Sequence, residues 1–242
     1  MRQEGACSPI DGRTLMTTDY AKTSLAPPIW VLATAVSAAN VGISLLSPAI
    51  PQLRDDLMVT SDEAQLVLSA FLIMLGFGQL IAGSLSDRIG RRPVLVYGSL
   101  LFVLSGFGAL LANSIEMLVF MRTLQGLGAA ACMAMGRVII SDSFQHAEAG
   151  RQMSTITMFQ SVVPLLGFSF GGVLADLVGW RGSVGLMVVT AAIVFAGASM
   201  LLAESRDPSI KPVPATRIIF VYWQLLVTPL FIANAMMAAT VT

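Results

Sequence analysis

Six long apolar segments, separated by short polar ones, constrain this chain more than any other feature of its sequence. A helix needs about 20 consecutive apolar residues to cross the hydrocarbon layer of a membrane. Core helices of soluble proteins are usually shorter and carry a polar face, and barrel strands alternate over about ten residues. The chain is therefore predicted to be an all-α membrane protein built as a six-helix transmembrane bundle. The six predicted spans are Ile29–Ile50, Ala64–Leu85, Pro93–Ala112, Met117–Ile140, Met153–Leu174 and Gly182–Ala203.

Composition indicates the surroundings of the chain, and proline content helps to divide the chain into segments. Charged residues make up only 12% of the 242 residues, about half the share of a soluble domain, and the net charge is zero. The zero net charge gives no indication of a nucleic-acid partner. The low share of charged residues indicates that the lipid bilayer surrounds the chain. We predict a cytoplasmic tail over residues 1–28, the six-helix bundle over 29–203, a proline-containing cytoplasmic linker over 204–228, and the start of a seventh transmembrane helix over 229–242.

Basic residues indicate the orientation, because they concentrate on the cytoplasmic side of membrane proteins. With the N-terminus inside, only Arg54 and Arg181 of the 14 basic residues fall outside, and Arg122 lies within the fourth span. We therefore expect a multi-pass protein of the plasma (inner) membrane with a cytoplasmic N-terminus. The eleven basic residues assigned to the cytoplasmic side are Arg2, Arg13, Lys22, Arg88, Arg91, Arg92, Arg137, Arg151, Arg206, Lys211 and Arg217.

An internal repeat connects the two halves of this bundle. The segment Gly83–Arg92 matches Gly172–Arg181 at an offset of 89 residues, with glycine, leucine, aspartate, glycine and arginine recurring in register. Three spans separate the copies, so the copies lie on opposite membrane faces. This arrangement is typical of a three-plus-three inverted repeat, a common plan in transporters. Chance similarity between two helix–turn–helix segments is the alternative.

The loop between the second and third spans, Gly83–Leu95, has residues with separate physical uses. Gly83 would permit close helix approach, and Gly90 a tight reversal. Asp87 can accept hydrogen bonds from backbone N–H groups or lie at the positive end of a neighbouring helix. An ordinary basic loop would contain similar residues. Three arginines hold the loop in the cytoplasm: Arg88, Arg91 and Arg92.

Three segments resemble motifs of the major facilitator superfamily. Gly83–Leu95 is similar to the family signature after the second span, and Arg122–Ala130 to its motif in the fourth span. Pro164–Gly172 resembles the antiporter motif of the drug-efflux branch, with Phe168 where proline is usual. Together with Ser47–Pro51, these segments are similar to drug:proton antiporters of the bicyclomycin-resistance kind. The bundle over 29–203 would then be the N-terminal half of a transporter, and 204–228 the linker between halves.

The resemblance implies roles for two groups of residues. One group would latch the outward-facing state by closing against a helix of the second half. The other would let the fifth span bend and pack, although simple small-residue packing explains its glycines equally well. The latch residues would be Gly83, Asp87, Arg88, Gly90, Arg91, Arg92 and Asp142, and the hinge residues Pro164, Gly167, Gly171 and Gly172.

Arg122 is the strongest single candidate for transport or coupling. It lies about five residues into the fourth span, where a charge usually faces a cavity or a partner. Snorkelling to the outer headgroups is the alternative. Gln125, Asn40 and Ser44 are further candidates, and Gln79 and Gln160 could also line a cavity or join helices. Ser44 stands where related transporters often have aspartate, and the six predicted spans contain no acidic residue.

Together these features predict a secondary transporter that exports small amphipathic molecules in exchange for protons by alternating access. Transport of sugars or other metabolites is one alternative, and a truncated fragment that does not transport is another. The expected partners are a small-molecule substrate, protons and the missing C-terminal half of the same protein. No metal-ligand spacing, nucleophile or phosphate-binding loop indicates an enzyme, a cofactor or a metal.

Overall fold

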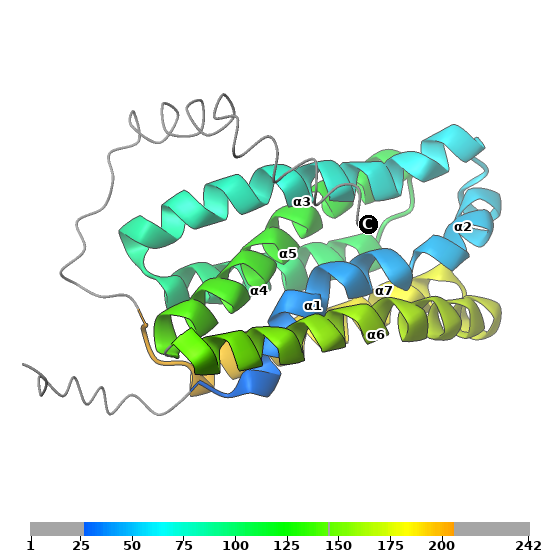
Figure 1. Ribbon diagram of the computed structural model, residues 1–242. Coiled ribbons are helices and arrows are strands. Elements are labelled where there is room, and N and C mark those ends of the chain that lie inside the picture. Colours follow the sequence, from blue (N-terminus) through cyan, green and yellow to red (C-terminus); the bar gives the residue numbers. More distant parts are fainter. Residues whose placement is uncertain (1–26, 145, 206–242) are drawn as a thin grey trace, which may run out of the picture.

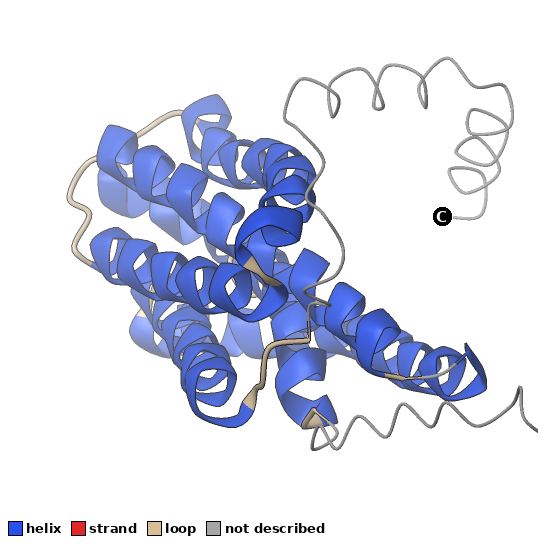
Figure 2. Ribbon diagram, turned by 90° about the vertical axis from the view of Figure 1, so that its left-hand side faces the viewer, coloured by secondary structure: helices blue, strands red, loops and turns tan. Residues whose placement is uncertain are grey.

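A computed structural model describes residues 27–144 and 146–205 and shows an all-helical bundle (Figures 1 and 2). No strand occurs among these residues. Six helical segments are long and apolar enough to cross a membrane, which confirms the predicted fold class. The helices are α1 (Ile29–Ser44), η1 (Ser47–Ala49), α2 (Ile50–Leu57), α3 (Ser61–Ile89), α4 (Arg91–Leu110), α5 (Ile115–Ser143), α6 (His146–Val178) and α7 (Trp180–Leu201). The predicted tail, most of the linker and the predicted seventh helix lie outside the described residues.

Three helices, α3, α5 and α6, extend beyond both ends of their predicted apolar spans. The α3 helix begins at Ser61 because Thr60 and Glu63 form a capping box, in which each side chain accepts a hydrogen bond from the other residue's backbone N–H group. The α6 helix begins seven residues before the predicted Met153, in a polar segment. Apolar length therefore located the most apolar part of each helix, whereas polar residues lengthen the ends of α3, α5 and α6.

The first span is broken near its C-terminal end. Pro48 lies in the short η1 helix and Pro51 in the first turn of α2, where proline removes no helical hydrogen bond. The α2 helix ends at Leu57, and the left-handed backbone of the next residue, Met58 (φ +52°), closes the last turn. The first span thus runs to Leu57 rather than to the predicted Ile50, as a main helix followed by a separate C-terminal segment.

Burial of the spans follows the predicted repeat. The most apolar stretches of equivalent spans are buried to similar extents. The buried shares are 67% and 61% for the spans of α1 and α5, 22% and 17% for α3 and α6, and 50% and 39% for α4 and α7. Each pair combines one helix from the first three spans with its counterpart from the second three. In Figure 1, α1 lies between α5 and α6, with α4 and α7 behind. Equivalent helices therefore occupy equivalent positions in the bundle.

The two turns of the repeat also match in backbone conformation. Gly90 and Gly179 are the glycines with positive φ among the described residues (+106° and +79°), and they are 89 positions apart. Arg92 Nη2 donates to the Ser199 carbonyl at the end of α7, 2.6 Å away. Reciprocally, Arg181 Nη2 donates to the Ala112 carbonyl just after α4, 3.1 Å away. These reciprocal contacts support an inverted repeat rather than chance similarity.

Candidate functional site

The signature loop forms an ion cluster that joins three helices. Arg91, at the start of α4, donates from Nη1 to Asp87 Oδ1 at the end of α3 and to Ser86 Oγ at 2.7 Å. Its Nε donates to Asp142 Oδ2 at the end of α5, 3.1 Å away. The Arg91 side chain is 16% exposed, whereas Asp87 is 50% exposed. Asp87, Arg91 and Asp142, three of the residues assigned to the latch, thus lie together, and their role as a latch stays a prediction.

Glu204 completes this loop and was not identified from the sequence. Its carboxylate accepts hydrogen bonds from the backbone N–H groups of Arg91 (2.9 Å) and Arg92 (3.3 Å), at the positive end of α4. Asp87 was expected to have such a role, but it pairs with the Arg91 side chain instead. Gly90 has a φ of +106°, which favours glycine, and a Cβ atom there would also displace the Glu204 carboxylate, 2.5 Å away.

Other signature residues differ in what they contact. Arg88 lies in the last turn of α3, where a cation interacts favourably with the carboxyl end of the helix. Gly83 was expected to permit close helix approach, but a Cβ atom there would meet no described atom within 4 Å. No close approach at Gly83 is thus present among the described residues, and its role in helix packing stays a prediction. Gly126 and Gly128 of α5 make such contacts instead, against Phe71 O of α3 and Gly98 O of α4.

Arg122 is completely buried in the N-terminal half of α5. Its Nη1 donates to Gln125 Oε1 at 2.6 Å, and its Nη2 donates to the Gly42 carbonyl of α1 at 2.8 Å. The guanidinium lies 4.3 Å from the centre of the Phe71 ring on α3, a cation–π contact. The Met187 sulfur of α7 lies 3.5 Å from Nη1. Arg122 thus contacts Gln125, a second transport candidate from the sequence, and a backbone carbonyl of α1.

This burial decides between the two interpretations of Arg122. A snorkelling side chain would reach the headgroups and be exposed, whereas Arg122 is 0% exposed and holds four helices together. The snorkelling interpretation is therefore wrong. Arg122 Nε and Gln125 Nε2 are buried without a hydrogen-bond partner among the described residues. The site thus has donors that a buried water or a substrate group could satisfy.

A second polar cluster joins α1, α5 and α6. Arg137 Nη2 donates to Gln160 Oε1 at 3.2 Å, and Asn40 Nδ2 donates to the Gln160 carbonyl at the same distance. Arg137 was assigned to a cytoplasmic segment, but it lies within α5, six residues before its end. Ser44 is buried, and its hydroxyl donates to the Asn40 carbonyl at 2.7 Å. Gln79 Nε2 lies 3.5 Å from the Met133 sulfur and thus joins α3 to α5.

The proposed hinge residues of α6 fall into two groups. Pro164 lies inside the helix. A Cβ atom at Gly167 would lie 2.0 Å from Ser44 Oγ, and one at Gly171 would lie 2.5 Å from the Leu45 carbonyl. These two glycines therefore permit close packing on the first span, which is the simpler interpretation of their role. Gly172 faces no described atom within 4 Å.

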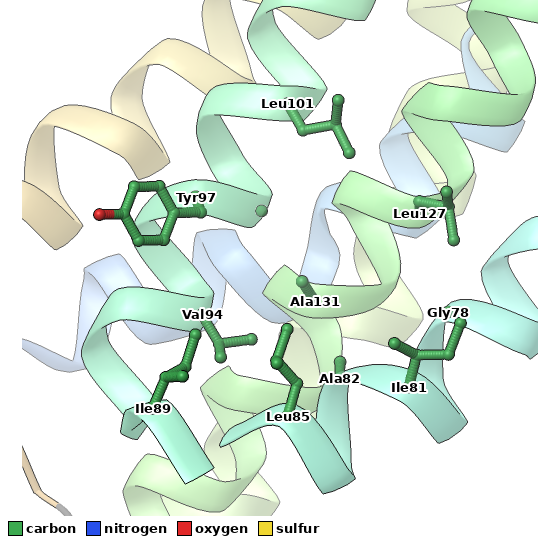
Figure 3. A pocket seen from close by; sticks show the side chains of 11 residues that line it. Gly78, Ile81, Ala82, Leu85, Ile89, Val94, Tyr97, Leu101, Leu127 and Ala131 are labelled. Atoms are coloured by element: carbon green, nitrogen blue, oxygen red, sulfur yellow. The ribbon is translucent and has the colours of Figure 1, made fainter. Parts of the chain in front are cut away.

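An apolar pocket of about 280 Å³ lies beside the signature loop, between α3, α4 and α5 (Figure 3). It contains none of the residues predicted to act in transport or coupling. Within residues 27–144 and 146–205, no group of three or more His, Cys, Asp or Glu side chains could hold a metal ion. The pocket is lined by Gly78, Ile81, Ala82, Leu85, Ile89, Val94, Tyr97, Gly98, Leu101, Leu127 and Ala131.

Comparison with known proteins agrees with this geometry. The Major Facilitator Superfamily pattern matches residues 31–242. Similar proteins include a chloramphenicol resistance protein of Pseudomonas aeruginosa (31% identity over 217 residues, 87% of this chain and 49% of the relative) and multidrug resistance protein D of Escherichia coli (31% over 183 residues, 75% and 45%). The chain thus spans about half the length of these relatives. It belongs to the major facilitator superfamily, a family of membrane transporters.

Proposed function

We propose that this chain is the N-terminal half of a proton-coupled exporter of small amphipathic molecules that works by alternating access. The main support is the Arg91 cluster, because its partly exposed ion pairs join α3, α4 and α5 at one membrane face. Such pairs are individually weak and can exchange partners as helices move. The names of the similar proteins, which are chloramphenicol and multidrug resistance proteins, favour export of antibiotics.

In this proposal, the Arg91 cluster latches the outward-facing state against a helix of a second half. Arg122 supports transport electrostatically, since its buried charge has no carboxylate partner among the described residues. The ten acidic residues between positions 27 and 205 all lie in loops or within a few residues of a helix end. A titratable group that exchanges protons would therefore come from the second half.

Transport of sugars or other metabolites is the second candidate function. Phe168 supports it, because it replaces the proline that is usual in the drug-efflux motif of the fifth span. Pro164 nevertheless stays within α6, and Gly167 and Gly171 contact the first span closely. We favour export because these residues keep the packing that the motif requires, even without the second proline.

Expression of the full-length gene in an efflux-deficient bacterial host tests the proposed function. We expect at least a fourfold increase in the chloramphenicol concentration that inhibits growth, together with lower accumulation of labelled chloramphenicol. A protonophore should restore accumulation, because proton exchange drives export. Unchanged chloramphenicol accumulation at confirmed membrane abundance, together with uptake of a sugar, would instead support the second candidate.

The proposed orientation places the N-terminus in the cytoplasm. We expect a cysteine introduced at Asn113 to react with a membrane-impermeant maleimide in intact cells, and one at Gly150 to react only after lysis. Asn113 is exposed beyond α4, and a Cβ atom at Gly150 meets no described atom within 4 Å. Cys7 and the buried Cys132 are first replaced by alanine. The reverse labelling pattern would invert the topology and place the Arg91 cluster outside.

A further inference from the structure

The hairpin formed by α3 and α4 is not closed by contacts between its two helices. Both helices pack along α5, and each contacts α5 far more than it contacts the other. Glycines allow this packing, because a Cβ atom at Gly78 of α3 or Gly98 of α4 would clash with Ala130 or Ala131 of α5. The pocket of about 280 Å³ occupies the space that remains between α3 and α4 (Figure 3). We call this pocket the hairpin groove.

The lining of the hairpin groove is unsuited to water. All of its lining residues are apolar except Tyr97, and the Tyr97 hydroxyl group points away from the other lining side chains (Figure 3). An ordered water needs polar partners, and the lining side chains offer none inside the groove. Ile81, Leu85 and Ile89 are nevertheless between 41% and 55% exposed, so the groove opens to its surroundings. In a membrane, the possible occupants are therefore lipid and another helix.

The dimensions of the hairpin groove match one hydrocarbon chain. Along α3 the lining runs from Gly78 to Ile89, which is about 16.5 Å of helix. The hydrocarbon layer of one leaflet is about 15 Å thick, half the thickness of the bilayer core. Spread over its length, the groove has a mean cross-section of about 17 Å², whereas a helix about 10 Å across has one of about 80 Å². The groove thus has the width of an acyl chain and is too narrow for a helix.

A basic residue lies at the end of the hairpin groove that is nearest the turn between α3 and α4. Arg88 follows Ile81 and Leu85 on the same side of α3, seven and three positions later, and it is exposed in the last turn of this helix. The neighbouring Asp87 lies on another side of α3 and pairs with Arg91. In the proposed orientation this end is cytoplasmic. Basic side chains at the cytoplasmic membrane surface attract anionic lipid headgroups.

We propose that the hairpin groove binds one acyl chain of an anionic phospholipid whose phosphate group pairs with Arg88. The chain extends along α3 towards Gly78 and covers the exposed sides of Ile81, Leu85 and Ile89. The phosphate oxygens accept charge-assisted hydrogen bonds from the Arg88 guanidinium. None of the residues assigned to transport or coupling lines this groove. Lipid binding here therefore goes beyond the proposed export function and does not depend on it.

Native mass spectrometry of the purified full-length protein tests this lipid site. The protein is incubated with phosphatidylglycerol, which is anionic, or with phosphatidylcholine of identical acyl chains, which is zwitterionic. We expect the wild-type protein to retain phosphatidylglycerol at least fivefold more often than phosphatidylcholine. Ile81→Trp fills the groove and should lower retention of phosphatidylglycerol at least fivefold. Arg88→Gln keeps the groove but removes the charge, so it should lower retention of phosphatidylglycerol to the level of phosphatidylcholine.

Two matched controls separate this site from general effects of bulk and charge. Leu80→Trp places the same bulk on the adjacent residue of α3, which is similarly exposed but lies outside the groove. Arg151→Gln removes an exposed positive charge from α6. Both proteins should retain phosphatidylglycerol as the wild type does.

Equal retention of phosphatidylglycerol by Ile81→Trp and Leu80→Trp would overturn the lipid site and leave side chains of a second-half helix as the cover of the groove. Equal retention of the two lipids by the wild-type protein would overturn the pairing of an anionic headgroup with Arg88. Because lipid retention is measured without transport, either result would leave the proposed export function standing.

Discussion

Replacement of Arg122 by alanine is expected to abolish transport by the full-length protein, and replacement by lysine to reduce it at least tenfold. The guanidinium uses two separate nitrogen atoms to donate to Gln125 Oε1 and to the Gly42 carbonyl. Its planar face simultaneously covers the Phe71 ring at 4.3 Å. A lysine ammonium is a point charge on a thinner stem and cannot reproduce this fork and stacked geometry. A tenfold loss corresponds to about 1.4 kcal/mol, close to the value of one charged hydrogen bond.

The loss of transport must be separated from a loss of folding, because both variants leave acceptors in the core. Alanine removes both hydrogen bonds and leaves a cavity, so its membrane abundance and thermal stability are expected to fall as well. The lysine variant is therefore the decisive one. It should reach near-normal abundance, since it retains the charge and most of the buried volume. Arg54→Lys is the matched control, because Arg54 is exposed and pairs with the neighbouring Asp55.

Transport is measured as export of chloramphenicol per unit of membrane protein. A fully active Arg122→Lys protein would show that charge alone is sufficient, and it would remove the geometric role proposed here. A lysine variant whose transport and thermal stability fall in parallel would identify Arg122 as a structural residue that joins four helices.

The six spans could be predicted from the sequence because lipid imposes a simple requirement on length and polarity. Each predicted apolar segment corresponds to a helix that crosses the bundle. The helix ends were less predictable, since they depend on capping contacts and polar turns. Thr60 and Glu63 could have located the start of α3, because their spacing is that of a capping box. No comparable signal precedes α6.

The candidate site was predictable where it depended on neighbours in sequence, and not where it depended on distant contacts. Arg122 and Gln125 are three residues apart on one helix, so their contact followed from helical spacing. Glu204 lies 113 residues from Arg91, and local patterns give no indication of such a contact. Gly83 shows a further limit, because sequence does not indicate which side of α3 packs against a neighbour. Arg137 was missed because its position near a predicted span end suggested a cytoplasmic residue.

Asp87→Asn is expected to reduce transport at least tenfold while membrane abundance stays near normal. Asparagine preserves the shape of the side chain but removes the negative charge that pairs with Arg91. Because Asp87 is half exposed, this ion pair contributes only about 0.2–1 kcal/mol to folding. In the proposed latch, by contrast, the same charge sets the balance between outward-facing and inward-facing states. A shift of 1.4 kcal/mol in that balance changes the ratio of the two states tenfold.

The internal repeat supplies the matched control for this prediction. Asp176 occupies the equivalent position 89 residues later, on the opposite membrane face, and accepts a hydrogen bond from Gln52 at 3.3 Å. It does not pair with an arginine four residues later as Asp87 does, because that position is Trp180. Asp176→Asn should therefore transport chloramphenicol at nearly the wild-type rate. Equal losses in both variants would indicate a shared structural role for the two aspartates. Normal transport by Asp87→Asn would show that the Asp87–Arg91 pair has no part in the transport cycle. The signature loop would then be an ordinary basic loop between two spans.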